Sequence, residues 1–107
     1  MRIVAALPNP AGADGGHETV TLINTGPTAV DLAGWQVRDR QLQAAGKPGT
    51  LLAGTIAAGE ALRVTLQAPV ALSNAGDDLV LLDAGGAVVD QATYGGPQAT
   101  SGATIVF

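Results

Sequence analysis

The sequence predicts an all-β fold, a Greek-key sandwich of roughly eight or nine short strands. Fifteen glycines and six prolines are spread along the 107 residues and divide the chain into short segments. Between these breakers lie runs rich in Val, Ile, Leu and Thr, and several of them alternate apolar and polar residues as half-buried strands do. Turn signals recur about every ten residues, which is the spacing of a β-sandwich.

The first two strands are expected at Arg2–Leu7 and Glu18–Asn24. The second run alternates, so Val20 and Leu22 should share the face that is turned to the core. Asn24-Thr25-Gly26-Pro27 should turn the chain after it. Asn and Gly tolerate a positive φ, and Pro cannot continue a central strand.

Further strands are expected at Ala29–Leu32, Trp35–Asp39, Gly49–Leu52, Ala61–Gln67, Asp78–Asp83, Ala87–Tyr94 and Thr104–Phe107. In Ala61–Gln67 the alternation places Leu62, Val64 and Leu66 toward the core. Asp78–Asp83 is apolar on both faces, which predicts a strand that is covered on both sides. Helical periodicity is confined to Gln41–Gly46, where a single turn is expected to stop at Gly46 and Pro48.

Composition excludes several classes of partner. The net charge is −4, and the chain holds only five Lys and Arg residues. Only Arg38 and Arg40 lie close together. Nucleic-acid binding needs clustered basic residues that neutralise phosphates, so no nucleic-acid partner is expected. The absence of cysteine excludes disulfides and thiolate chemistry.

No segment is expected to insert into a membrane. No apolar run approaches the ~20 residues that a spanning helix needs. Pro8 interrupts the apolar run at the N-terminus too early for a signal peptide. An extracellular or cell-envelope location is expected if the sequence is excised from a longer protein, and the compartment is otherwise open.

Two stretches of the sequence have a recognisable order of strand and turn residues. The first comprises Pro8-Asn9-Pro10, Asp14, Glu18–Asn24 and Asp31–Asp39, and the second comprises Ala58–Leu62, Leu72–Asp83 and Gly86–Tyr94. Together they resemble the lamin tail domain family in its prokaryotic form. The resemblance covers nearly the whole chain in the family's order. It implies one immunoglobulin-like β-sandwich domain over residues 1–107, of the accessory kind found attached to secreted bacterial enzymes and surface proteins. The heptad rod and prenylation motif of nuclear lamins do not occur here, so lamin biology is not expected to apply.

Trp35, the only tryptophan, is expected to be the packing centre, with Leu32 beside it. Aromatic residues make up only 3% of the chain. A buried Trp covers about 150–250 Å² and contributes about 4–6 kcal/mol at ~25 cal/mol per Å². Gly34 before it allows a tight bend. The alternative, an exposed Trp35 that acts as a binding hot spot, stays open.

Acidic residues raise the question of a calcium site, because carboxylate oxygens are the ligands that calcium prefers. The candidates are Asp14, Glu18, Asp77, Asp78 and Asp83. No loop motif of the EF-hand kind occurs, and Asn74-Ala75-Gly76-Asp77 is explained more simply as a turn. Glu18 is expected to be solvated or to cap a turn. We therefore assign no metal-binding or cofactor-binding residues, and calcium remains the alternative.

A catalytic group can be assembled only by residue type, from His17 with Asp14 or Asp90 and with Ser73 or Ser101. The sequence has no nucleophile elbow and no H-E-x-x-H helix. Its Gly-Gly pairs lack the following helix that a phosphate cradle needs. The chain is therefore expected not to be an enzyme, and no catalytic residues are assigned.

Two functions are consistent with these observations. The first is a non-catalytic accessory module that binds a protein or a cell-envelope component. The alternative is a structural domain that packs against its neighbours or against copies of itself. In Thr104–Phe107, Ile105 and Phe107 should share one face and Val106 should point the other way. An uncharged edge strand invites strand addition, so weak self-association through Val106 is expected.

Overall fold

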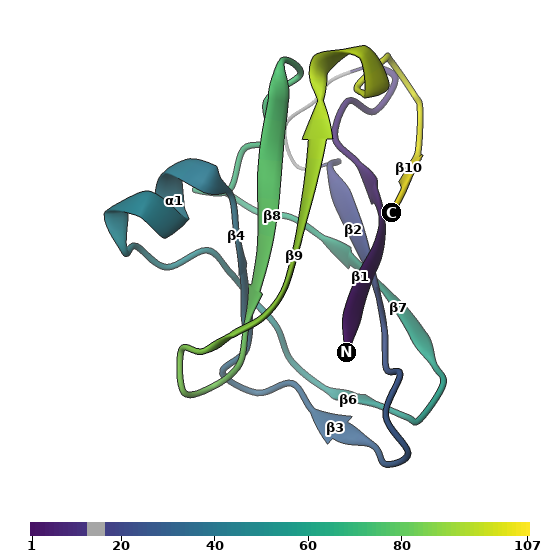
Figure 1. Cartoon of the computed structure of the whole chain (residues 1–107), viewed down its shortest axis with the longest axis vertical. Helices are drawn as coiled ribbons and strands as arrows, with labels where there is room; N and C mark the ends of the chain where they lie inside the picture. Colours follow the sequence, from purple (N-terminus) through teal and green to yellow (C-terminus); the bar gives the residue numbers. More distant parts are fainter. Residues whose placement is uncertain (13–16) are drawn as a thin grey trace.

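The computed structural model describes residues 1–12 and 17–107, and within them it shows a largely antiparallel β-structure (Figure 1). Its strands are β1 (Arg2–Leu7), β2 (Thr19–Ile23), β3 (Val30–Asp31), β4 (Gln36–Arg38), β5 (Thr50–Leu51), β6 (Thr55–Ile56), β7 (Ala61–Thr65), β8 (Gly76–Leu82), β9 (Val88–Gly95) and β10 (Ile105–Val106). The helices are α1 (Arg40–Ala45) and the single 3₁₀ turn η1 (Gly96–Gln98). The all-β prediction is confirmed. The strand that it lacked is β6, which pairs with β3.

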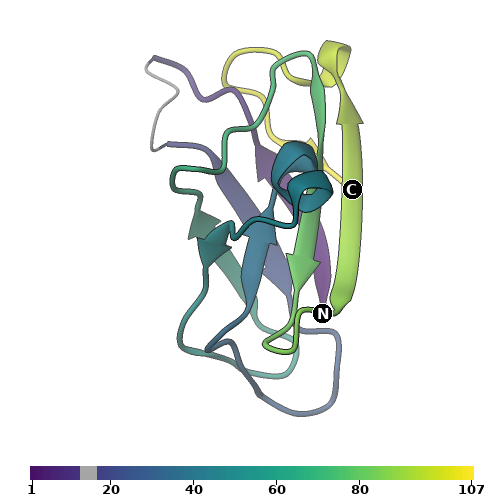
Figure 2. The same cartoon turned by 90° about the vertical axis from the view of Figure 1, so that its left-hand side faces the viewer.

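Two four-stranded sheets face each other and form the sandwich (Figure 2). The first sheet has the order β10-β1-β2-β7, and the second has the order β5-β4-β8-β9. The pair β3-β6 lies at the lower end of the molecule in Figure 1. Because β4, β5 and β6 lie between β2 and β7 in the chain, the backbone leaves the first sheet and returns to it. This is the crossing pattern of a Greek key.

The core is aliphatic and draws on both sheets. Its fully buried members are Ile3, Val20, Leu22, Leu32, Val37, Ile56, Leu66, Leu79 and Leu81. The alternation predicted for the second strand is confirmed, since Val20 and Leu22 are both 0% exposed. In β7, Leu62 and Val64 are partly buried and pack against the core. Ala61, Arg63 and Thr65, which alternate with them, are exposed.

Trp35 is not the packing centre, and that prediction is wrong. The indole is only partly buried and packs against the core from its margin. Trp35 lies just before β4. Its backbone N–H donates to the carbonyl of the fully buried Leu32 at 2.9 Å. The fully buried large side chains of the core are all Leu, Ile and Val. Gly34 makes the expected bend, with φ of 83°.

Strand β8 is buried on both faces, as its apolar sequence predicts. Leu79 and Leu81 point into the core, whereas Val80 and Leu82 lie outside the core cluster and are still only 1% and 2% exposed. The outer face of the second sheet therefore has apolar cover of its own.

The helical turn is confirmed, and its two ends are capped. The Asp39 carboxylate accepts the Leu42 N–H at 2.8 Å, and the helix ends at Gly46 in the left-handed conformation. The turn after β2 is formed differently from the prediction, because neither Asn24 nor Gly26 has a positive φ. Instead, the Asn24 side chain accepts the Gly26 N–H at 3.0 Å. None of the helices in the described ranges is both long and apolar enough to span a membrane.

Candidate functional site

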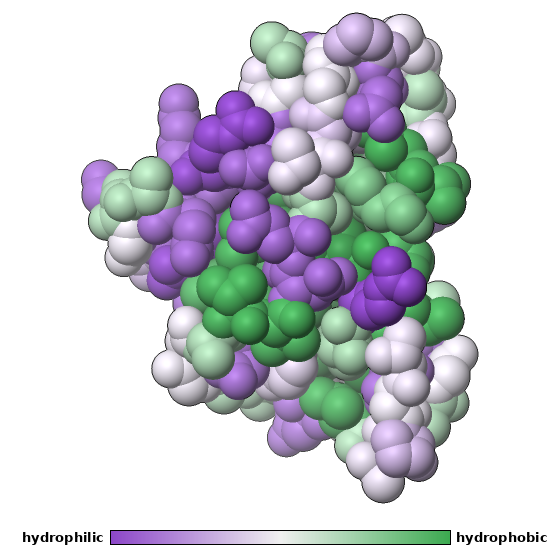
Figure 3. Space-filling view, in the orientation of Figure 1, coloured by the Kyte–Doolittle hydropathy of each residue, from purple (hydrophilic) through white to green (hydrophobic). Residues whose placement is uncertain are grey.

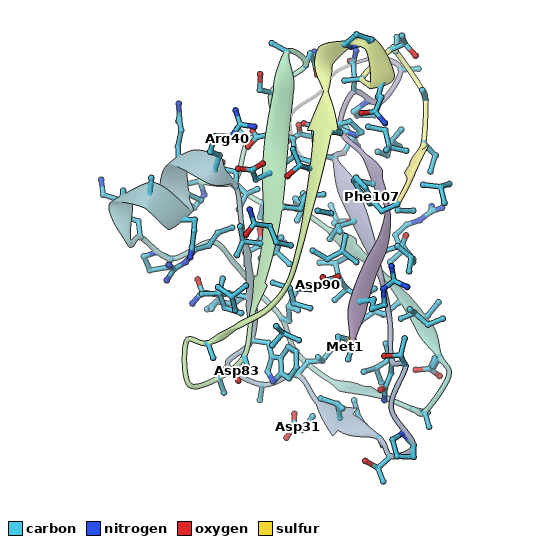
Figure 4. All side chains as sticks on the ribbon, in the orientation of Figure 1. Met1, Asp31, Arg40, Asp83, Asp90 and Phe107 are labelled. Carbon is cyan, nitrogen blue, oxygen red and sulfur yellow. The ribbon has the colours of Figure 1, made fainter. Side chains whose placement is uncertain are left out.

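Two side chains close the seams between the two sheets. At the first seam, Asp90 of β9 reaches β1, where its Oδ2 accepts the Ile3 N–H at 2.8 Å (Figure 4). At the second, the Thr50 hydroxyl of β5 lies against Gln67, just beyond β7. It accepts the Gln67 N–H at 2.9 Å and donates to the Gln67 carbonyl at 3.1 Å. Both contacts satisfy backbone groups that have no ladder partner.

The buried carboxylates hold loops in place at one end of the sandwich. Asp77 is 6% exposed. Its carboxylate accepts the backbone N–H groups of Arg40, Ser73 and Asp78 at 3.0, 3.0 and 2.8 Å. Asp39 caps α1 with one oxygen, and with the other it accepts the Ala71 N–H at 3.1 Å. Backbone donors therefore occupy the carboxylates that the sequence leaves unexplained.

Glu18 is buried, so the expectation that it is solvated is wrong. It is 8% exposed and accepts the Leu72 N–H at 3.1 Å, across 54 residues of sequence. The loop before β8 is thereby tied to the start of β2. This contact could not be predicted from the residues near Glu18, because its partner comes from a distant part of the chain.

The remaining calcium candidates are also engaged by the protein. Asp83 accepts the N–H groups of Gly85 and Ala87 in the β8–β9 turn, at 3.0 and 2.9 Å. Asp78 pairs with Arg40, and Asp14 lies outside the described residues. Within residues 1–12 and 17–107, no three His, Asp or Glu side chains are grouped so that they could hold a metal ion.

The candidate catalytic residues have separate roles where the structure describes them. Asp90 closes the β1–β9 seam, and the Ser73 hydroxyl accepts the Ala75 N–H at 3.1 Å. His17 and Ser101 are exposed. None of the hydrogen bonds formed by Asp90 or Ser73 leads to the His17 imidazole.

An open depression of about 210 Å³ lies beside α1, and Arg40, Gln41, Ala71, Ser73, Gly76 and Asp77 line it. Arg40 donates from Nε and Nη2 to the two oxygens of Asp78, at 3.0 and 3.3 Å. This pairing holds the pKa of Asp78 below its usual range. The Arg40 fork and the Asp77 carboxylate are thus both committed within the fold.

Tyr94 lies behind this loop region. It is 2% exposed, and its hydroxyl donates to the Ser73 carbonyl at 2.7 Å. Burial raises the pKa of Tyr94 well above its usual range, and the nearby Asp77 carboxylate acts in the same direction. The side chain therefore remains a neutral hydrogen-bond donor.

The outer face of the second sheet carries an apolar row, which we define as Leu51, Leu82 and Val88. Register places Gln36 of β4 between Leu51 and Leu82, and places Val88 beside Leu82. Leu51 is 70% exposed and Val88 is 51% exposed. Figure 3 shows an apolar area on this face below α1, over the lower part of β4 and β8.

The polarity of this face changes along the strands. Beyond the apolar row, Arg38 and Gln91 flank Val80. Farther toward α1, Asp78 joins Arg40 to the Thr93 hydroxyl, which donates to Asp78 at 2.8 Å. Within the apolar row, Leu51 and Val88 are exposed and Leu82 is buried between the strands that carry them.

A second exposed apolar side chain lies at the edge of the first sheet. Strand β10 pairs only with Ala5 and Ala6 of β1, and Val106 is 79% exposed. Ile105 is 4% exposed and Phe107 packs against the core, so the predicted alternation is confirmed. The prediction that Val106 mediates self-association remains a prediction.

These features define a class, an antiparallel immunoglobulin-like sandwich whose buried polar side chains hydrogen-bond within the fold. A family model described as Lamin Tail Domain matches residues 2–96. The chain therefore belongs to the lamin tail domain family, which is a family of non-enzymatic immunoglobulin-like domains. Neither the curated proteins nor the solved structures gave a match.

The apolar row was not identified from the sequence. Leu51 stands next to Leu52, and Val88 stands next to Val89, so each belongs to a pair of adjacent apolar residues. Adjacent strand residues point to opposite faces, and composition alone does not tell which one lies on the outer face of the sheet. Pairing with β4 and β8 decides it.

Proposed function

We propose that this domain is a non-catalytic binding module that holds a protein partner through the outer face of the second sheet. The observation that carries the proposal is the apolar row. Two of the four large exposed hydrophobic side chains, Leu51 and Val88, lie on this face. Exposed apolar side chains that cluster on one face are typical of interaction sites, whereas single ones are not.

The chemistry of the row favours a protein over the other partner classes. Its contact atoms are aliphatic, so a partner gains by covering them with its own apolar side chains, at about 25 cal/mol per Å² of apolar surface. A polyanion would instead need clustered cations. The net charge is −4, and Arg40 on this face is already paired with Asp78.

The proposal is tested with matched baits in an extract of the cells that make the parent protein. The baits are the wild type, the double variant Leu51→Lys with Val88→Lys, and a control with Ala45→Lys and Ala58→Lys. All four positions are exposed, and the two variants carry the same added charge.

A protein retained by the wild type and the control, and then shown as a purified component to bind the Leu51/Val88 variant at least tenfold more weakly, supports the proposal. Equal binding of that component to all three baits contradicts it. So does an extract in which no protein distinguishes the wild type from the Leu51/Val88 variant.

A second candidate function is weak structural self-association through β10. Two observations favour it: Val106 is 79% exposed, and β10 is the edge of its sheet. The Phe107 N–H donates to the Val4 carbonyl, so the backbone groups of Val106 point away from β1. Two copies could pair their β10 strands there.

Sedimentation across a concentration series tests this candidate with the wild type and Val106→Lys. Self-association of the wild type that is lost in Val106→Lys supports it. Monomeric behaviour of both proteins excludes it and leaves the proposal for the second sheet untouched.

A further inference from the structure

Strand β7 is the longer of the two edge strands of the first sheet, and it runs along the lower right margin of Figure 1. Its inner side pairs with β2 over its whole length, from Thr19↔Thr65 to Ile23↔Ala61. Strand β10, at the opposite edge, has only two residues.

The flanking hydrogen bonds show which β7 backbone groups face outward. The Leu66 N–H donates to the Glu18 carbonyl, and the Asn24 N–H donates to the Glu60 carbonyl. In an antiparallel ladder the bonded positions alternate, so the backbone groups of Leu62 and Val64 also face β2. Those of Ala61, Arg63 and Thr65 face the free edge.

Just beyond β7, the Thr50 hydroxyl takes the place of a partner strand along this edge. It binds both backbone groups of Gln67, the next outward-facing position after Thr65. No hydrogen bond from a described residue reaches the outward backbone groups of Ala61, Arg63 or Thr65. Three consecutive ladder positions are thus left for another strand.

The side chains of β7 specify what such a strand should carry. Leu62 and Val64 pack on the core but are only partly buried, because no strand lies beyond them. Arg63 points to the opposite, outer face, and its guanidinium makes no ion pair with any residue that the structure describes. A neighbouring strand would therefore gain from apolar residues opposite Leu62 and Val64 and an acidic residue opposite Arg63.

Arg63 also argues against a second copy of β7 as the occupant. Full antiparallel pairing of two β7 strands centres on Arg63 and sets the two guanidinium groups directly opposite each other. Like charges in that position destabilise the pair, and a charged residue on an edge strand is a known protection against self-pairing.

We propose that the free edge of β7 binds an extended segment of another protein as an added antiparallel strand, with an apolar-acidic-apolar pattern opposite Val64, Arg63 and Leu62. Backbone bonds to Ala61, Arg63 and Thr65 supply the affinity, and the acidic residue sets the register. This surface is separate from the apolar row of the second sheet.

The test uses an end-capped peptide, Thr-Val-Glu-Val-Thr, and its Thr-Val-Lys-Val-Thr counterpart, titrated into the isotope-labelled protein while backbone amide signals are recorded. Both peptides are titrated into the wild-type protein and into the Arg63→Glu variant. Arg63 is exposed, so the variant should keep the fold, and unchanged core amide signals verify this.

The proposal expects the Glu peptide to shift and protect the Ala61, Arg63 and Thr65 amides, and to bind the Arg63→Glu variant about two- to fivefold more weakly. The Lys peptide should show the reverse preference. No change at these amides, a change centred on Val106 instead, or the same peptide preference in both proteins would overturn the proposal.

Discussion

The Asp90 carboxylate of β9 accepts the Ile3 N–H of β1 at 2.8 Å, and this bond ties the edge strand of the second sheet to the first sheet. The bond lies at a position of β1 that β10 does not reach. The β1–β2 register shifts between Ile3 and Ala5, and β10 pairs only with Ala5 and Ala6. A side chain from the second sheet thus replaces the strand that does not extend to Ile3 (Figure 4).

Replacing Asp90 by Ala should destabilise the domain by about 1–3 kcal/mol, because the Ile3 N–H would lose its acceptor in a largely buried position. Asp90→Asn should lose less, since the amide oxygen can still accept. Urea unfolding measures both, with Gln91→Ala on the exposed face of the same strand as the control. If all three variants unfold alike, Asp90 does not close this seam.

Asp77→Ala should be more damaging than Asp90→Ala. It removes the acceptor of three N–H groups, those of Arg40, Ser73 and Asp78. Each donor left unsatisfied costs about 1–3 kcal/mol, reduced where water can enter. Thermal unfolding of both variants measures the loss.

Thermal unfolding of the wild type is also measured with calcium and with a chelator. We expect no difference between the two conditions, and stabilisation by calcium would show that these carboxylates are ligands after all.

Tyr94 makes stability fall at high pH. Its pKa is raised in the folded state, so above the ordinary tyrosine pKa of about 10 the folded protein holds a proton that the unfolded chain releases. The free energy of unfolding should therefore not change with pH through Tyr94 below that value, and it should decline as the pH rises above it. Tyr94→Phe should be less stable at neutral pH by about 0.5–1.5 kcal/mol, for the lost bond to Ser73. Its decline at high pH should be shallower, and parallel declines would contradict this assignment.

Trp35 should contribute less than the central aliphatic residues. Leu22→Ala should cost about 2–5 kcal/mol, the range for a fully buried leucine. Trp35→Ala should cost less than the ~3 kcal/mol expected when a buried aromatic ring is removed. Iodide should quench the native Trp35 fluorescence in part. Complete protection from iodide, with a larger loss in Trp35→Ala than in Leu22→Ala, would restore Trp35 as the packing centre.

The sequence predicted the strands whose pattern is local. The alternation in β2 and β7 and the doubly apolar β8 determined which side chains face the core, and Gly46 marked the end of α1. Strands β3 and β6 have two residues each and exist because Val30 pairs with Ile56, so no local pattern indicates β6.

The candidate site was less accessible to sequence reasoning, for the same physical reason. The Glu18–Leu72 contact spans 54 residues, and Leu51 and Val88 come to lie on the face of Leu82 only through the register of four strands. Trp35 was misplaced because its burial depends on how far the aliphatic layer extends, which is a property of both sheets together.

Site-specific photo-crosslinking tests the central claim, that the outer face of the second sheet holds a protein partner. A photoreactive amino acid is placed at Leu51, at Val88, or at the exposed control positions Ala45 and Ala58, in cells that make the parent protein. We predict one discrete protein adduct shared by Leu51 and Val88 and absent from Ala45 and Ala58. No adduct at Leu51 and Val88, or the same adducts at all four positions, would contradict the claim.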